Sequence, residues 1–364
     1  MEIVVTNTNF WNGRRVLITG HTGFKGAWLS FWLRENGAEV FGYSLDPPTN
    51  PNLFEIAKIG EILSGDARAD IRDLSALEET LRRTRPEIVF HMAAQSLVRL
   101  SYEIPVETFS INVMGTVHLL RAVRHIPSVR AAVIVTSDKC YENLGAGKPY
   151  RETDPMGGAD PYSASKGCAE IVVASFRTSA AALRPQGSDI AIASARSGNV
   201  VGGGDWSSNR LVPDCIRSFV AGIPVELRNP NAVRPWLHVL EPLSGYVSLA
   251  EQLVGANSKR FATAFNFGPS PDNDADVLQV AQTVADLWGH QARVEAVGGT
   301  HPPEAAVLRL DATKASRLLN WQARWNITQA LERAVEWYKV WHAGRDVRPI
   351  MIRQLADFTV APTK

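Results

Sequence analysis

The sequence predicts an α/β fold, in which a doubly wound parallel sheet is joined to a smaller α/β lobe. Three observations lead to this prediction. Over about the first 200 residues, short apolar runs alternate with amphipathic helical patterns, as in repeated βαβ units. The runs are apolar throughout, which is typical of parallel strands that are covered on both faces. A glycine-rich loop follows the first run and opens the first helix, so the sheet is expected to be of the Rossmann type.

The elements of this sheet follow one another in a regular order. A buried strand at residues 16–19 leads into a helix at 24–36, and Gly37 stands where a C-cap is expected. Further strands are expected at residues 38–44, 62–65, 87–93, 131–137 and 189–196. Helices are expected at residues 74–84, 106–124 and 161–183.

The pattern changes after Arg196. Three glycines at 202–204 and a polar stretch at 205–210 indicate a loop. Beyond it, helices are expected at residues 213–222, 277–288 and 328–342, and strands at 233–239 and 264–268. We therefore divide the chain into a dinucleotide-binding domain (1–196, with a return segment at about 237–264), a second lobe (197–236 and 265–352) and a tail (353–364).

Composition excludes several classes of protein. The 364 residues are enough for about two domains with a sizeable core, and 45% hydrophobic with 21% charged residues is ordinary for a globular protein. The 38 basic and 37 acidic residues nearly cancel, which argues against nucleic-acid binding. Cys140, Cys168 and Cys215 share no CxxC spacing, so no metal site is expected, and their low, odd number fits a reducing, cytoplasmic compartment. No signal peptide or membrane-spanning run is expected.

The loop after the first strand is expected to bind a dinucleotide. Its glycines permit a tight turn and a close approach of the backbone to a pyrophosphate, which the helix N-terminus would receive. A glycine triplet alone is weak evidence, but here it opens the first βα unit, as this mechanism requires. The loop residues expected to contact the cofactor are Gly20, Thr22, Gly23, Phe24, Lys25 and Gly26.

Asp46 is a candidate ligand of the adenosine ribose. It lies 20 residues after Gly26, near the end of the second strand, and a carboxylate there favours NAD over NADP. The alternative is that Ser44 is the strand-end residue and that Asp46 only starts a turn.

Tyr162 and Lys166 form a YxxxK pair in an expected helix, where a spacing of four places both side chains on one face. A lysine ammonium near a phenol lowers the tyrosine pKa, so Tyr162 could act as a general base.

With these residues in place, the chain resembles the extended short-chain dehydrogenase/reductase family over nearly its whole length, and its sugar-nucleotide branch in particular. The resemblance implies NAD as cofactor, bound also by Asp70, Ile71, Ala93, Ala94, Gln95, Tyr162 and Lys166. It implies a substrate bound by Gln95, Ser96, Ser137, Asn199, Arg210, Leu211 and Arg234. Arginine and amide donors suit a diphosphate.

The segment Ser137, Asp138 and Lys139 resembles the site of the 4,6-dehydratases in this branch, which use a second acid/base pair. Lysine in place of the usual glutamate implies CDP-glucose as substrate, and a lyase of deoxysugar and O-antigen biosynthesis. The resemblance implies that Tyr162 takes a proton at carbon 4, that Ser137 hydrogen-bonds the same oxygen, and that Asp138 protonates the leaving hydroxyl of carbon 6. Lys139 would be the base at carbon 5, and the sequence leaves open whether its amine is neutral.

Three alternatives stay open at this point. One is a sugar-nucleotide epimerase, which needs Tyr162 and NAD but not Asp138 and Lys139. Another is a 4,6-dehydratase of another nucleotide hexose, such as GDP-mannose or dTDP-glucose. The third is an NAD(H)-binding sensor without catalysis. Family members usually pair through the two long helices, here 106–124 and 161–183, so a homodimer or a dimer of dimers is expected.

Overall fold

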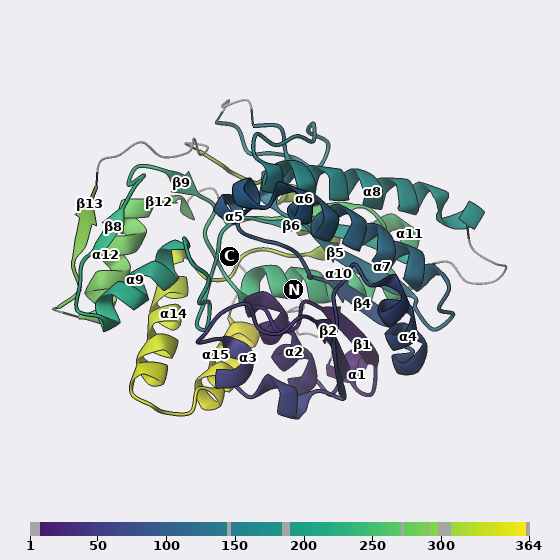
Figure 1. The fold of residues 1–364 in the computed structure, drawn as a ribbon, viewed down its shortest axis with the longest axis horizontal. Helices are drawn as coiled ribbons and strands as arrows, with labels where there is room; N and C mark the ends of the chain where they lie inside the picture. The colour runs from purple at the N-terminus through teal and green to yellow at the C-terminus, as the bar shows by residue number, and fades with distance from the viewer. Residues whose placement is uncertain are drawn as a thin grey trace.

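The computed structural model describes residues 8–143, 147–183, 190–270, 273–289, 291–297 and 307–361. Its centre is a parallel sheet of seven strands in the order β11-β6-β5-β4-β1-β2-β3, which lies at the right of Figure 1. These strands are β1 (Arg15–Thr19), β2 (Glu39–Ser44), β3 (Gly65–Arg68), β4 (Ile88–His91), β5 (Ala131–Val135), β6 (Ala191–Ser197) and β11 (Ala264–Phe267). Every neighbouring pair is parallel, which confirms the predicted doubly wound sheet.

Helices cover both faces of the sheet. Alternate residues of the central strands face opposite sides, so Ile18 packs in one hydrophobic core and Leu17 in another. The first core is closed by α2 (Phe24–Glu35) and α10 (Leu240–Val254). The second is closed by α4 (Leu74–Thr84), α7 (Gly115–Arg124) and α8 (Pro161–Leu183). Shorter helices on this part of the chain are α1 (Thr8–Trp11), α3 (Leu53–Ile56), α5 (Val98–Glu103), α6 (Pro105–Phe109), α11 (Ser258–Phe261) and α13 (Thr313–Leu319).

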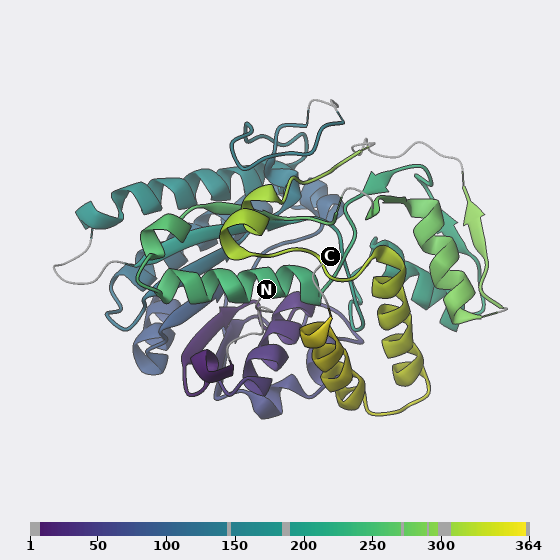
Figure 2. The same cartoon turned by 180° about the vertical axis from the view of Figure 1, so that it is seen from behind.

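A smaller lobe lies at the left of Figure 1 and at the right of Figure 2. Its helices are α9 (Leu211–Val220), α12 (Val277–Trp288) and α14 (Ile327–His342). Its strands form three short pairs, β10 with β7, β12 with β9, and β13 with β8. The bounds are β7 (Val200–Val201), β8 (Val225–Leu227), β9 (Val233–Arg234), β10 (Leu237–His238), β12 (Ala275–Asp276) and β13 (Val294–Ala296). The strand expected at 233–239 is interrupted at Pro235, which lacks the N–H that a ladder requires.

Two elements differ from the prediction in the first half of the chain. The strand expected at 62–65 is wrong, because Ile59–Ile62 forms a 3₁₀ turn whose side chains pack on the core, and the strand is β3 at the sheet edge. The long helix expected at 106–124 is divided into α6, a π-helical turn at Ser110–Met114 and α7. Such π turns often occur at functional sites, and this one carries Asn112 toward the cavity loops described below.

The expected division of the chain differs in two places as well. The expected lobe includes residues from 265 onward, whereas β11 pairs with β6 and completes the large sheet. The expected tail begins at residue 353, whereas α15 (Arg348–Val360) continues to Val360, and its Phe358 is buried against Trp32 of α2. The apolar spacing of Met351, Leu355 and Phe358 explains this docking. Within the described residues, no helix is long and apolar enough to cross a membrane.

Candidate active site

A cavity of about 990 Å³ opens where the carboxyl ends of the parallel strands face the lobe. All the residues that the sequence singles out line it. They are Gly20, Thr22, Gly23, Phe24, Lys25, Gly26, Asp46, Asp70, Ile71, Ala93, Ala94, Gln95, Ser96, Ser137, Asp138, Lys139, Tyr162, Lys166, Asn199, Arg210, Leu211 and Arg234. The structure therefore brings together segments from both halves of the chain.

The glycine loop has the shape that a bound pyrophosphate requires. Gly20 has a φ of +75°, and a Cβ on Gly26 would lie 2.1 Å from the Gly20 carbonyl oxygen. The Gly23 N–H donates to that same carbonyl at 3.1 Å, which closes the turn. Gly23 caps α2 without a side-chain hydrogen bond, so the first N–H groups of the helix point toward the loop unshielded by a cap. The loop thus fits a dinucleotide phosphate.

The end of β2 offers two polar side chains. The Ser44 hydroxyl already forms a hydrogen bond within the protein, because it lies 2.9 Å from the Thr22 hydroxyl of the glycine loop. Asp46 is 91% exposed, and its carboxylate lies 3.4 Å from the guanidinium of Arg68 on β3. Asp46 is therefore the more available ligand for a ribose. Arg68 carries no local signal in the sequence, because only the sheet order places β3 beside β2.

Asp70 and Ile71 follow β3, the strand beside β2 at the edge of the large sheet. The carboxylate of Asp70 accepts hydrogen bonds from the backbone and guanidinium of Arg72, which hold the pKa of Asp70 below its ordinary value. Ile71 is buried, and a Cβ on Gly115 of α7 would lie 2.8 Å from its side chain. These contacts make one rigid wall of the cavity.

The loop after β4 is tied to the helix that carries Tyr162. Asn112 accepts from the Gln95 N–H at 2.9 Å, and donates to the Gln95 carbonyl at 3.0 Å and to the Ser165 hydroxyl at 2.8 Å. The side-chain amide of Gln95 donates to Leu97 and Thr108. The amide nitrogen of Gln95 thus orders its own loop, and Asn112 fixes that loop relative to α8.

Ser137, Asp138 and Tyr162 meet at the end of β5. The Ser137 hydroxyl donates to Asp138 Oδ1 at 2.9 Å. Burial raises the pKa of Tyr162 to about 12, rather than lowering it as the YxxxK pair predicts, although the nearby Ser137 hydroxyl opposes this shift. Burial also raises the pKa of Asp138. Asp138 Oδ2 is buried and has no hydrogen-bond partner among the described residues, and this atom lies 3.1 Å from where a Cβ on Gly198 would stand.

Two lysines flank this group. Lys166 is buried, which lowers its pKa to about 8, while the charge of Glu170 one helical turn later opposes the shift. Lys139 is half-buried, and its backbone N–H donates to the Ser137 hydroxyl at 3.2 Å. The site therefore combines a protonatable carboxyl, a phenol and two amines within one strand end and one helix.

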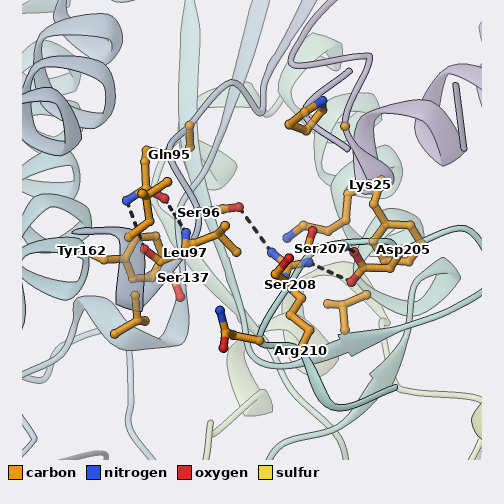
Figure 3. A pocket seen from close by; sticks show the side chains of 18 of the residues that line it. Lys25, Gln95, Ser96, Leu97, Ser137, Tyr162, Asp205, Ser207, Ser208 and Arg210 are labelled. Atoms are coloured by element: carbon orange, nitrogen blue, oxygen red, sulfur yellow. Dashed lines mark hydrogen bonds and ion pairs between the residues drawn. The ribbon is translucent and has the colours of Figure 1, made fainter. Parts of the chain in front are cut away.

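Arg210 crosses the cavity from the lobe side (Figure 3). Its guanidinium donates to Asp205 at 2.9 Å and to the Ser96 hydroxyl at 3.3 Å. Lys25, at the start of α2, lies near Arg210, and its pKa is lowered to about 7 by burial and by the charges of Arg210 and Lys166. Such a concentration of cations suits a diphosphate. The sequence analysis missed Asp205, although an acidic residue five positions before Arg210 in a polar loop was a readable signal.

The remaining candidates come from the lobe. Arg234 is buried and its charge acts on Asp138, where it lowers the carboxyl pKa against the effect of burial. The Asn199 carbonyl accepts from the Leu237 N–H at 2.9 Å, and Leu211 begins α9. One further pair was missed by the sequence analysis. His21 is fully buried and its Nε2 lies 2.9 Å from Asp66, in a space that exists because residue 42 is glycine.

Comparisons with known proteins agree on the kind of molecule. The family model described as GDP-mannose 4,6 dehydratase matches residues 17–334. The chain is 49% identical to CDP-glucose 4,6-dehydratase of Salmonella typhimurium, over 98% of this chain and 99% of that protein. It is 27% identical to dTDP-glucose 4,6-dehydratase of Xanthomonas campestris, over 88% of this chain and 92% of that protein. A solved structure of UDP-glucose-4-epimerase from Stenotrophomonas maltophila with bound NAD matches with 25% identity and a TM-score of 0.77, over 91% of this chain and 99% of that one.

Proposed function

This chain belongs to the GDP-mannose 4,6 dehydratase family, and we propose that it removes water from CDP-glucose to give CDP-4-dehydro-6-deoxyglucose. The observation that carries the proposal is the second acid/base pair, Asp138 and Lys139, which stands beside Tyr162 in one cavity. The likeness to the Salmonella enzyme over the whole chain supports CDP-glucose as the substrate. The product would serve deoxysugar and O-antigen biosynthesis.

We propose NAD as the cofactor, because the glycine turn fits a dinucleotide phosphate and the Stenotrophomonas neighbour contains NAD. The bound cofactor would supply reversible hydride transfer, first from carbon 4 and then to carbon 6, so that it would not be consumed. The phosphates would lie on Gly20, Thr22, Gly23, Phe24, Lys25 and Gly26. Asp46 would accept from the ribose, Asp70 and Ile71 would face the adenine, and Ala93, Ala94, Gln95, Tyr162 and Lys166 would face the nicotinamide side.

The first step requires a base at the carbon-4 hydroxyl. Tyr162 takes this proton, and Ser137 hydrogen-bonds the same oxygen as carbon 4 becomes a ketone. Burial raises the pKa of this phenol to about 12, so the pKa must be lowered for Tyr162 to act as a base. Positive charge from Lys166 and from the cofactor would stabilise the phenolate when the site is filled.

The elimination requires a second base and an acid. The carbon-4 ketone acidifies the proton at carbon 5, and Lys139 removes it and returns a proton to carbon 5 when the hydride is delivered to carbon 6. Asp138 protonates the leaving hydroxyl of carbon 6, which its buried, pKa-raised carboxyl suits. The unpartnered Oδ2 atom of Asp138 is the natural position for this proton.

The substrate would be bound by groups from both sides of the cavity. Gln95 and Ser96 lie on the sheet side. Asn199, Arg210, Leu211 and Arg234 lie on the lobe side, where arginines can pair with a diphosphate. The Arg210 guanidinium donates to the Ser96 hydroxyl at 3.3 Å, so the lobe side and the sheet side of the cavity are in contact at this point.

We also propose that the protein forms a homodimer and works in the cytoplasm. Apolar side chains are exposed along one flank of α5, α6, the π turn and α8, and such a patch is typical of a protein interface. They are Tyr102, Val106, Phe109, Met114 and Ile171. The molar mass in solution, measured by light scattering, tests the dimer. The three free thiols favour a reducing compartment.

An assay with a panel of nucleotide hexoses tests the main proposal. The purified protein is incubated with NAD and with CDP-glucose, dTDP-glucose, UDP-glucose or GDP-mannose in turn, and the ketone product is followed by its absorbance. Ketone formation from CDP-glucose alone is the expected result. Ketone from another nucleotide, an epimer without ketone, or NAD binding without turnover would each replace the proposal with the corresponding alternative.

A further inference from the structure

A buried ion pair lies behind the strand end that carries Ser137, Asp138 and Lys139. The Arg196 guanidinium on β6 donates to the Glu170 carboxylate on α8 at 2.7 Å, and their side chains are 4% and 2% exposed. Neither residue lines the cavity, and the mechanism above uses neither. A buried pair of this kind is weak evidence for stability, because desolvation offsets its attraction, so its purpose calls for another explanation.

The Glu170 carboxylate joins three elements. Its Oε1 accepts from the Thr136 hydroxyl at 2.5 Å, and its Oε2 accepts from the Ser194 hydroxyl at 2.7 Å as well as from Arg196. Thr136 directly precedes Ser137, so this carboxylate fixes the beginning of the acid/base segment. Each of these hydrogen bonds makes the position of the buried carboxylate more rigid.

The Arg196 guanidinium reaches the other end of the same segment. It donates to the Tyr141 hydroxyl at 2.7 Å and lies 5.0 Å from the centre of that ring. The Tyr141 hydroxyl in turn donates to Asn266 on β11 at 2.6 Å. Since Tyr141 stands two residues after Lys139, the segment is fastened on both sides.

The same carboxylate is continuous with the helix that carries the first base. Glu170 follows Lys166 by four residues and Tyr162 by eight, so all three lie on one face of α8. The pair thus connects the helix of Tyr162 with the strand end of Asp138 through two side chains.

We propose that Glu170, Arg196 and Tyr141 form a positioning network that sets Asp138 and Lys139 relative to Tyr162. This inference rests on the proposed function. Thr136 and Glu170 secure Ser137 and the first base, which the oxidation at carbon 4 uses. Tyr141 secures the end of the segment that carries Asp138 and Lys139, which only the elimination uses. The Tyr141 contact of the network is therefore required more for elimination than for oxidation.

The variant Tyr141→Phe tests this difference, because it removes one hydroxyl and keeps the ring over Arg196. Tyr150→Phe is its matched control. Tyr150 stacks on Tyr141 with ring centres 5.0 Å apart, but its exposed hydroxyl donates to Asn143 and not to Arg196. Both variants are mixed rapidly with NAD and CDP-glucose, and the near-ultraviolet absorbance of reduced nicotinamide is followed together with ketone product. Melting temperature and the dissociation constant of CDP are measured in parallel.

In Tyr141→Phe we expect oxidation within about threefold of wild type and elimination slowed at least about tenfold, so that reduced nicotinamide accumulates. CDP affinity should be unchanged, and Tyr150→Phe should match wild type. Thr136→Val, which frees the other end of the segment, should instead slow oxidation as well. If Tyr141→Phe slows both steps equally, or lowers only the melting temperature, the network is merely structural and the inference is wrong.

The same measurements separate this inference from the proposed function. A wild-type protein that does not turn over CDP-glucose would overturn the proposed function and this inference with it. The inference alone would be overturned if the wild type turns over CDP-glucose and the Tyr141→Phe variant shows the same ratio of oxidation rate to elimination rate as the wild type.

Discussion

Replacement of Gly20 by alanine should weaken both NAD binding and the fold, whereas the same replacement at a matched glycine outside the cavity should weaken only the fold. Gly20 has a φ of +75°, and an added Cβ would lie 2.7 Å from the backbone nitrogen of Ala93. Gly13 offers a matched control, because it has a φ of +71° and no heavy atom within 4 Å of its added Cβ. The two variants share the same left-handed backbone strain, and only one of them has a clash.

The structure gives the size of both effects. A left-handed residue with a Cβ costs about 1–2 kcal/mol, so both variants should lose about this much free energy of unfolding. Ordinary contact begins at 3.4 Å, so Gly20→Ala must also push the glycine loop away from the loop at Ala93 by about 0.7 Å. Since misplacement by about 1 Å can cost on the order of 100-fold in a site, we expect NAD to bind at least about tenfold more weakly.

Isothermal titration with NAD and thermal melting check this prediction. Gly13→Ala should melt below wild type but bind NAD normally, whereas Gly20→Ala should melt at or below the Gly13→Ala midpoint and bind NAD poorly. Equal NAD affinity in both variants, within about threefold, would refute the assignment of this loop to the cofactor.

Three other predictions concern acidic residues. Asp138→Asn should lower the rate of dehydration at least about 100-fold while reduced nicotinamide still forms, because only the acid is lost. Unchanged product formation would rule out Asp138 as the acid that protonates the leaving hydroxyl. Asp46→Asn should raise the affinity for NADP relative to NAD, measured by titration with both cofactors, since a 2′-phosphate would no longer meet a carboxylate; an unchanged ratio would point to another ribose ligand. Glu241 is fully buried on α10, where its carboxylate accepts from the backbone N–H groups of Arg324 and Trp325. Burial raises its pKa from 4.5 to about 7, so its contribution to stability is full below about pH 4.5 and is lost as the pH rises through 7, by about 3 kcal/mol. Denaturant unfolding of Glu241→Gln should therefore show a flatter pH dependence between about pH 5 and pH 8, and a slope equal to that of wild type would contradict it.

The order of elements and the place of the site could be predicted from the sequence because both follow from local pattern. Apolar runs and helical periods identify the strands and helices, and the carboxyl ends of parallel strands always meet at one edge. The strand expected at residues 62–65 differs from the observed β3 because β3 is polar and half-exposed, whereas the apolar residues before it pack as a turn. The tail was misjudged because α15 gains its stability from Trp32 and other distant partners.

Pairs of side chains from distant segments could not be predicted in this way. Arg68 reaches Asp46 only because β3 lies beside β2, and Arg210 reaches Ser96 across 114 positions of the chain. Glu170 was within reach of sequence reasoning, since it continues the face of α8 that carries Lys166, but its partner Arg196 lies on another element. Such contacts depend on the packing of whole elements rather than on any local motif.

The central claim is that one hydrogen leaves carbon 4 and returns to carbon 6 of the same sugar. CDP-glucose that carries deuterium at carbon 4 tests it directly, with the product analysed by mass spectrometry and nuclear magnetic resonance after turnover in ordinary water. We predict a product lighter by one water, with the deuterium at carbon 6. Deuterium that remains at carbon 4, or that is lost to solvent, would contradict the account.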